Sequence, residues 1–437
     1  MKKSLLALAG LSAFAGVAQA DDSYVQLYGI LDVAVGSVTN QYDASATFPA
    51  SVNPYSKTQA TGAVTGMFNG GISDSRWGLK GAEDLGGGLK AIFVLESGFN
   101  APTGALNNAA GALATSANGT TYNKVNSSAN SSLNGQLFNR QAWIGLSDAK
   151  YGTLTAGRNY SPFYDIAVSY DPVQNAQLFS PLGFSGTIGG GGGVSENTRL
   201  DNSLKYTNKV GGVNFGGVYK FGMQPNGGSQ GQVWGVNAGY EMGDVGFQVA
   251  YLGSTDALYA ASCDASSHGC AAGSNAVNVT NANTNAVFTA AKYKATKELT
   301  LKAGWEWYKL STPSTQLTAG TGLASNYYGY SINYVTNLSS ANVQSTNVFF
   351  LGGDYNFMPN LNLAVGLYKQ QAGNCATTSN CANNIYTYSA LLDYNLSKRT
   401  DVYTGVANSQ YSGAYFSANP AYQKSNTIYA VGIRHKF

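Results

Sequence analysis

TIYAVGIRHKF, residues 427–437, is the stretch that decides the fold, because its side chains alternate between two chemical kinds. Successive residues of a strand point to opposite faces of a sheet. One face carries Tyr429, Val431, Ile433 and Phe437, and the other carries Ala430, Gly432, Arg434 and Lys436. The first face suits lipid and the second suits water, so the pattern predicts a strand that crosses a membrane.

Fifteen further segments show similar alternation, separated in turn by short turns and long polar loops. We expect strands at 24–37, 73–83, 89–99, 137–147, 152–160, 199–207, 213–221, 232–241, 245–254, 285–295, 299–309, 345–357, 360–370, 385–396, 400–408 and 427–437. In hydrocarbon every backbone N–H and C=O needs a partner, and a closed sheet provides one without an open edge. The predicted fold is all-β, a sixteen-stranded antiparallel transmembrane β-barrel.

The composition agrees with a barrel wall. Charged residues make up only 11% of the chain, well below the roughly 25% of soluble proteins, whereas Gly (54) and Tyr (30) are abundant. No run of 18 apolar residues follows residue 20, which excludes helical membrane spans. The formal net charge of +3 is too balanced for a nucleic-acid partner, which would need a clustered basic face.

The first twenty residues have the three parts of a secretory signal peptide. Lys2 and Lys3 begin the chain, residues 5–17 are mostly apolar, and Ala18-Gln19-Ala20 is a small-residue cleavage site. We therefore expect residues 1–20 to be removed on export and residues 21–437 to form the barrel.

Charged side chains lie on the faces opposite the apolar ones, and they distinguish a barrel with water inside from a soluble double sheet or propeller. They are Asp32, Lys80, Glu96, Lys205, Lys302 and Glu306. A soluble core would not tolerate so many unpaired charges, whereas a water-filled interior would.

The longest segment between predicted strands, about residues 161–198, is rich in aromatic residues and contains no Lys or Arg. Loops of this length tend to be functional. We expect this third outer loop to fold into the lumen, with Asp165, Asp171 and Glu196 as its acids. Inward positions of neighbouring strands carry Arg76, Lys80, Arg140, Arg199 and Lys205. An acidic loop opposite a basic wall would produce a transverse field across a narrow aqueous constriction.

Three phrases of the sequence resemble the trimeric general-diffusion porins of Gram-negative outer membranes. They are SRWGLKG at 75–81, RQAWIGL at 140–146, and GRNY at 157–160 followed by Tyr164-Asp165. The EDLGGG turn at 83–88 and the terminal phenylalanine resemble the β-proteobacterial branch. The resemblance extends over residues 21–437 and implies an outer-membrane channel through which ions and small hydrophilic solutes diffuse passively.

The resemblance also implies roles for individual residues. Arg76, Arg140 and Arg199 would form the basic cluster of the constriction with Lys80 beside it, and Asp171 and Asp165 would form its acidic side. Phe437 would be the signal that the barrel-assembly machinery reads. The implied partners are two further copies of the chain in a homotrimer, membrane lipid and lipopolysaccharide. One departure is that PVQNA after Asp171 lacks a second nearby acid, which weakens the expectation of cation preference.

Arg158 has outward parity beside Leu154 and Ala156, so we expect it at a subunit contact. A charge that faces lipid at the middle of a barrel wall costs about 2–4 kcal/mol. Small outward residues on the first, fourth and fifth strands, Gly29, Ala142 and Ala156, favour the same region for assembly.

Four cysteines lie in two close pairs, Cys263 with Cys270 and Cys375 with Cys381, within polar loops of an exported chain. Two small disulfide rings are therefore expected. Neither spacing is a zinc-ligand pattern and only His268 is nearby, so we expect no metal and no cofactor.

An enzyme is the rival class, since some outer-membrane barrels are hydrolases with a Ser-His pair. The chain has only two histidines, His268 and His435, and neither has an evident serine and orienting carboxylate. A substrate-specific sugar or anion channel is a nearer alternative. A sugar channel would need a track of inward aromatic residues, but Trp77, Trp305 and Trp307 have outward parity.

Overall fold

The computed structural model describes residues 23–42, 61–106, 137–182, 199–222, 229–262, 276–316, 331–377, 381–414 and 423–437. Sixteen strands within these ranges form the wall of a barrel. They are β1 (Tyr24–Tyr42), β3 (Arg76–Gly86), β4 (Leu89–Gly98), β5 (Gln141–Asp148), β6 (Gly152–Tyr160), β7 (Arg199–Val210), β8 (Val213–Lys220), β9 (Val233–Met242), β10 (Val245–Ser262), β11 (Ala276–Lys294), β12 (Leu299–Ser311), β14 (Gln344–Met358), β15 (Leu361–Ala372), β16 (Asn383–Asn395), β17 (Thr400–Ser412) and β18 (Gln423–Lys436). No helix of the described part is long and apolar enough to span a membrane.

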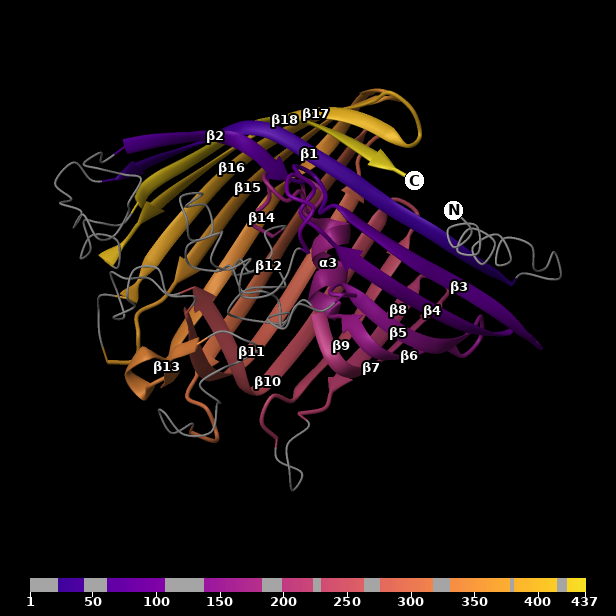
Figure 1. Ribbon diagram of the computed structural model, residues 1–437, viewed down its shortest axis with the longest axis horizontal. Coiled ribbons are helices and arrows are strands. Elements are labelled where there is room, and N and C mark those ends of the chain that lie inside the picture. The colour runs from indigo at the N-terminus through magenta and orange to yellow at the C-terminus, as the bar shows by residue number, and fades with distance from the viewer. Residues whose placement is uncertain are drawn as a thin grey trace, which may run out of the picture.

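The sheet closes where the first strand meets the last. β1 pairs antiparallel with β18 from Ile30 opposite Lys436 to Tyr42 opposite Gln423, and its other edge pairs with β3. Each remaining wall strand pairs antiparallel with the next one along the wall (Figure 1). The predicted sixteen-stranded antiparallel barrel is therefore confirmed.

Two short strands were not predicted. β2 (Thr61–Asn69) lies in line with β3 and pairs with the long-loop end of β1, and β13 (Ser331–Asn337) pairs in parallel with β11. Several wall strands also extend further at this end than expected; β10, for example, reaches Ser262 rather than residue 254. These stretches lie in segments that were expected from the sequence to be long loops between the predicted strands.

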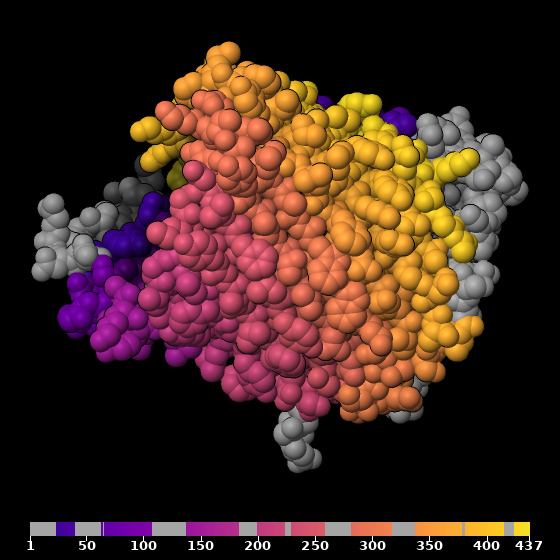
Figure 2. All heavy atoms as spheres, turned by 180° about the vertical axis from the view of Figure 1, so that it is seen from behind, coloured from indigo at the N-terminus to yellow at the C-terminus, as the bar shows by residue number. Residues whose placement is uncertain are grey.

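The wall has the expected alternation between exposed apolar side chains and side chains buried on the other face. On β18, Tyr429, Val431 and Ile433 are 57%, 62% and 51% exposed, whereas Ile428 and Arg434 are 0% and 8% exposed. Figure 2 shows the outer surface formed by the second half of the chain as one continuous wall. Side chains on the opposite face of the strands line the interior.

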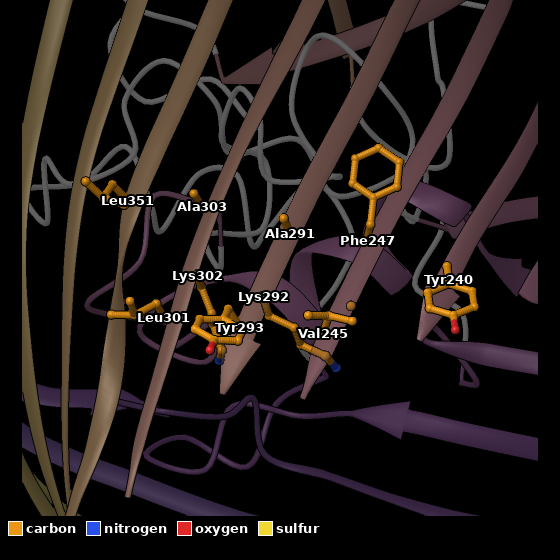
Figure 3. Close-up of a pocket in the computed structure, with 11 residues that line it drawn as sticks. Tyr240, Val245, Phe247, Ala291, Lys292, Tyr293, Leu301, Lys302, Ala303 and Leu351 are labelled. Carbon is orange, nitrogen blue, oxygen red and sulfur yellow. The ribbon is translucent and has the colours of Figure 1, made fainter. Parts of the chain in front are cut away.

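The outer face also carries an apolar hollow of about 420 Å³ across β9–β12 and β14 (Figure 3). Exposed side chains at alternate positions line it, including Tyr240, Phe247, Tyr293 and Leu351. Because these positions belong to the lipid-facing set, this hollow is part of the outer wall and not of the channel.

Residues 161–182, named here the inner loop, follow the inside of the wall. α3 (Pro162–Tyr170) begins at Ser161, whose hydroxyl accepts a hydrogen bond from the Tyr164 N–H, and Pro162 occupies the first turn, where no N–H is needed. The helix lies inside the barrel and packs against β8–β12 (Figure 1). The ring of Phe163 lies 5.5 Å from that of Phe288 on β11. Further along, the Phe179 carbonyl accepts a hydrogen bond from Ser389 on β16. Residues 183–198 of the predicted loop lie outside the described residues.

Asp171 ends α3 and fixes the inner loop to the wall. Its carboxylate is 0% exposed and accepts hydrogen bonds from the Tyr368 hydroxyl at 2.6 Å and the Asn175 N–H at 2.6 Å. Lys302 on β12 donates to the Asp171 carbonyl at 3.1 Å. Burial raises the pKa of this carboxyl from 3.8 to about 6, although the hydrogen bonds oppose the rise.

This raised pKa predicts a specific pH dependence of stability. Between pH 4 and 6 the unfolded chain has already released the Asp171 proton while the folded chain keeps it, so the free energy of unfolding falls as pH rises. The loss is at most about 3 kcal/mol. Asp171→Asn should therefore gain stability relative to wild type as pH rises through this window, measured as the thermal unfolding temperature in detergent. The exposed turn variant Asp244→Asn is the control, and equal pH slopes for Asp171→Asn and wild type would contradict the assignment.

A second prediction concerns the closing strands. A Cβ atom at Gly29 would lie 2.2 Å from the Phe437 ring and 2.8 Å from the Arg76 carbonyl oxygen, whereas at Gly66 it would meet no atom within 4 Å. Overpacking of this kind costs about 1–3 kcal/mol. Gly29→Ala should lower the unfolding temperature followed by circular dichroism, and Gly66→Ala should lower it less. Equal effects of the two substitutions would contradict the contact at the closure.

Candidate functional site

The predicted basic residues lie on or next to three alternate wall strands, β3, β5 and β7. Arg76 begins β3, Lys80 lies further along it, Arg140 directly precedes β5, and Arg199 begins β7. The guanidinium carbons of Arg140 and Arg199 lie 5.9 Å and 5.6 Å from the centroid of the Tyr160 ring on β6. Cations at this distance are attracted to the ring face. The structure thus brings Arg140 and Arg199 together around one aromatic side chain.

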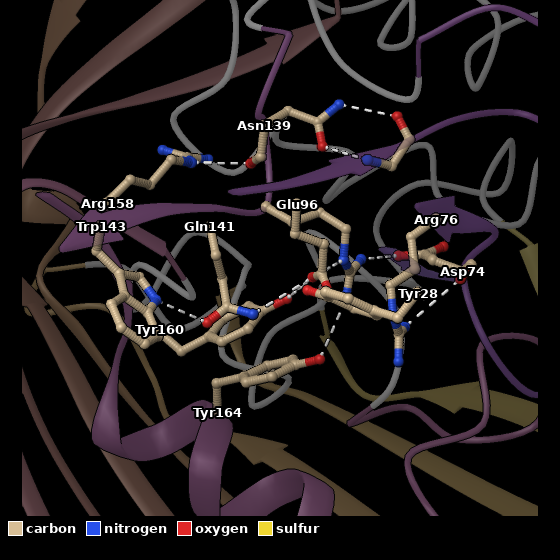
Figure 4. A network of polar contacts seen from close by, with 12 residues as sticks. Tyr28, Asp74, Arg76, Glu96, Asn139, Gln141, Trp143, Arg158, Tyr160 and Tyr164 are labelled. Atoms are coloured by element: carbon tan, nitrogen blue, oxygen red, sulfur yellow. Dashed lines mark hydrogen bonds and ion pairs between the residues drawn. The ribbon is translucent and has the colours of Figure 1, made fainter. Parts of the chain in front are cut away.

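Glu96 on β4 joins Arg76 and Arg140 in one network (Figure 4). It is 4% exposed, and its carboxylate lies 3.6 Å from Arg76 Nε and 2.8 Å from Arg140 Nε. The hydroxyls of Tyr28 and Tyr160 donate to it at 2.9 Å and 3.1 Å. Sequence alternation placed Glu96 inside the barrel but did not assign it to the basic cluster.

Asp74 is a second acid that sequence reasoning missed. It lies just before β3, and its carboxylate accepts a hydrogen bond from Arg140 Nη1 at 2.8 Å. Arg140 is 4% exposed, and its guanidinium lies between the carboxylates of Asp74 and Glu96. Because these two carboxylates are so close to the guanidinium, they cancel most of the electric field that Arg140 would produce further away in the lumen. The Arg76 side chain is 24% exposed, and Lys80 is also partly exposed, so these two carry the more accessible charges.

The acidic side differs from expectation. Asp165 on α3 has a side chain that is 49% exposed and forms an ion pair with Lys205 on β7. Asp171 was expected beside it, but it is 0% exposed and does not face water. After Asp171 the chain turns at Pro172 and brings the Asn175 N–H back to the carboxylate, which covers it. Among the described residues, Asp165 is thus the acid of the inner loop that faces the lumen, and Glu196 lies outside them.

Arg158 was expected at a subunit contact, but the structure places its guanidinium within the chain. Arg158 is 5% exposed, pairs with Asp201, and donates to the Asn139 carbonyl at 2.8 Å. β6 carries a bulge between Gly157 and Asn159, and Gly157 has a φ of +135°. A bulge interrupts strand alternation, so parity counted through Leu154 does not place the Arg158 side chain on the lipid face.

Of the remaining predicted residues, the structure describes Phe437, Cys375, Cys381 and His435. Phe437 exchanges two backbone hydrogen bonds with Gly29, each 3.1 Å long, and its side chain is 46% exposed. The structure joins Cys375 and Cys381 by a disulfide. The pair Cys263 and Cys270, together with His268 and the predicted signal peptide at 1–20, lies outside the described residues. His435 is on β18, where its ring Nδ1 lies 2.9 Å from the Thr400 hydroxyl.

Curated relatives resemble part of the chain. An outer membrane porin protein of Bordetella pertussis is 37% identical over 223 residues, which cover 51% of this chain and 48% of that protein. Outer membrane porin protein 32 of Delftia acidovorans is 32% identical over 254 residues, covering 58% of this chain and 59% of that one. These matches span about half the length of the curated relatives.

The barrel also resembles solved structures over nearly its whole length. An anion-selective porin from Comamonas acidovorans superimposes with a TM-score of 0.63 at 21% identity, covering 95% of this chain and 100% of the other. At this identity the likeness concerns the fold. The family described as Gram-negative porin matches residues 6–273 and 254–414. Because these two matches include most of the sequence, the chain belongs to the Gram-negative porin family.

Proposed function

We propose that this porin forms a water-filled channel in the outer membrane for passive diffusion of ions and small hydrophilic solutes. The observation that carries the proposal is the closed barrel with exposed apolar side chains outside and charged side chains inside. A water-filled passage solvates the interior charges that stay partly exposed, such as Arg76 and Lys80, while the outer face contacts lipid. Export through the predicted signal peptide at 1–20 and a single barrel unit at 21–437 belong to the same proposal.

The narrow part of the channel is proposed to lie between the inner loop and the wall from β3 to β7. Four basic residues, Arg76, Lys80, Arg140 and Arg199, have Asp74 and Glu96 among them, and Lys205 offsets Asp165. The formal charge of this group of residues is positive. We therefore propose a mild preference for anions, and the Comamonas acidovorans neighbour, described as anion-selective, supports the same sign.

A substrate-specific sugar or anion channel is the second candidate. The stacked rings of Tyr160 and Tyr164, with centroids 4.1 Å apart, favour it because they place an aromatic pair directly beside the basic cluster. Their flanking by Arg140 and Arg199 would suit an anion better than an uncharged sugar.

The proposed assembly is a homotrimer. The first strand carries exposed apolar side chains, including Val25 at 67% and Leu27 at 57%, and the small residues Ala142 and Ala156 lie on β5 and β6. The third small residue, Gly29, lies against the Phe437 ring. Small residues let two walls approach closely. Lipid and lipopolysaccharide around the trimer, and recognition of Phe437 by the barrel-assembly machinery, are further parts of this proposal.

The channel and its assembly can be tested together in a planar lipid bilayer. Purified protein should raise the conductance in discrete steps, and at high voltage each inserted unit should close in three equal sub-steps. Uncharged sugars should pass without saturating the current. Failure of the wild-type protein to conduct would contradict the channel, single-step closure would contradict the trimer, and block by one solute at micromolar concentration would favour the substrate-specific channel.

The selectivity proposal predicts the effect of removing accessible charge. The double substitution Arg76→Gln with Lys80→Gln should move the zero-current potential in a salt gradient toward cation preference. Charges in water are screened over about 8 Å at physiological ionic strength, so the change should shrink as salt rises. Lys297→Gln, in the exposed turn between β11 and β12, removes one charge away from the lumen and should have no effect. An unchanged potential in the double variant would place the selectivity filter elsewhere.

A further inference from the structure

A short segment between β2 and β3 leaves the wall and turns inward. These residues, 70–75, are named here the hook. Asp32 on β1 lies next to the hook, is 0% exposed, and accepts three backbone hydrogen bonds from it. The donors are the N–H groups of Gly71 at 3.1 Å, Ile72 at 3.1 Å and Ser73 at 2.7 Å. One carboxylate thus fixes three consecutive residues of the hook.

On its other side, the hook contacts side chains of β17 and β18. The Tyr403 hydroxyl donates to the Asp32 carboxylate and accepts a hydrogen bond from the Gly71 N–H at 2.9 Å. Glycines make room for the tyrosine ring, because a Cβ at Gly71 or Gly432 would lie 2.3 Å or 2.2 Å from its atoms. Arg434 on β18 donates to the Ser73 hydroxyl at 3.0 Å. The hook is therefore bound to the strands that close the barrel.

The hook in turn binds the far end of the inner loop. Its Gly71 carbonyl accepts a hydrogen bond from the Leu178 N–H at 3.0 Å, and its Ile72 carbonyl accepts one from the Gln177 N–H at 3.2 Å. Ile72 and Leu178 are also buried in the same apolar cluster. Two backbone bonds of this kind resemble a short strand pairing, so the position of the loop end follows the position of the hook.

We propose that Asp32 and Tyr403 are positioning residues for the channel, which act through the hook to hold the inner loop against the wall and so set the width of the lumen. The inference rests on the proposed channel function. Neither residue belongs to the basic cluster, and both lie among strands at the closure of the barrel. The end of the loop is thus held at two adjacent places, residues 177–178 by the hook and Phe179 by Ser389 on β16.

The chemistry of Asp32 makes the proposal specific. A carboxylate accepts on both oxygens, whereas an amide has one accepting oxygen and one donating nitrogen. Asp32→Asn therefore keeps the size of the side chain but turns a donor toward at least one backbone N–H of the hook. A buried donor left without an acceptor destabilises that contact. Tyr403→Phe is the milder change, since it removes only the hydroxyl between Asp32 and Gly71.

Asp256 provides a matched control. It is also 0% exposed, and its carboxylate accepts N–H bonds from Ser314 at 2.6 Å and Thr315 at 3.0 Å. It lies on β10 at the long-loop end, and the structure gives its carboxylate partners in the segment after β12 rather than in the inner loop. Asp256→Asn therefore introduces the same chemical defect without releasing the hook.

Single-channel recording of the full-length protein tests the proposal. Brief sub-conductance events in Asp32→Asn are expected to rise about tenfold in frequency, because loss of one buried hydrogen bond commonly changes an equilibrium by that factor. Tyr403→Phe should show a smaller rise, and Asp256→Asn should match wild type. Circular dichroism and resistance of the folded band to detergent establish that each variant is a barrel.

The outcomes separate this inference from the proposed function. A conducting wild type with unchanged events in both Asp32→Asn and Tyr403→Phe would overturn the positioning role and leave the channel intact. Equal increases in Asp32→Asn and Asp256→Asn would also overturn it, because any buried carboxylate would then have the same effect. Should Asp32→Asn fail to fold, Tyr403→Phe decides the question by the same comparison with Asp256→Asn.

Discussion

The backbone of a chain in hydrocarbon must satisfy its own hydrogen bonds, and the arrangement of β1 follows from this constraint. One edge of β1 pairs with β18 from Ile30 to Tyr42, and the other edge pairs with β3 and then with β2. The pairing changes from β3 to β2 where residues 70–75 leave the wall. At this point the Gly70 N–H still donates to the Asp32 carbonyl at 2.9 Å, so one backbone hydrogen bond to β1 remains where the pairing changes strand. Closure of the barrel and the inward hook are thus two consequences of how one strand satisfies both of its edges.

The interior follows a second rule, that a charge covered by protein needs a partner. Arg140 lies between Asp74 and Glu96, and Arg434 lies between Asp401 and Asp393. Such pairs contribute little to the electric field in the lumen. The exposed charges of Arg76, Lys80 and Asp165 contribute more. The electrostatics of the lumen are therefore set by which charges remain open to water rather than by the number of basic residues on its wall.

Period-two alternation was sufficient to predict the wall, because lipid contact imposes it on the membrane-spanning part of each strand. It predicted β6 at its observed bounds, but it missed β2 and β13, which lie in segments that were expected to be long loops. For the site, alternation placed Arg76 and Glu96 inside the barrel without showing that they pair across β3 and β4. It failed for Arg158, where a bulge changes the parity, and for Asp171, whose burial depends on the path of the loop. Which side chains pair across strands depends on the strand register and on the path of the loop. Neither produces a periodic pattern in the sequence, so alternation cannot predict them.

Two aspartate–tyrosine pairs fix the inner loop to the wall at different places. Asp171 belongs to the loop and accepts the hydroxyl of Tyr368 on β15, whereas Asp32 belongs to the wall and accepts the hydroxyl of Tyr403 on β17. Both carboxylates also accept backbone N–H groups, so each converts a turn of the chain into a fixed shape. The loop has no Lys or Arg with which to form ion pairs. Its aromatic residues pack against the wall, but apolar packing is not directional and does not by itself fix one position of the loop. The hydrogen bonds of the buried carboxylates are directional and fix the position of the loop. The geometry of the lumen therefore depends on residues of the wall that do not belong to the basic cluster.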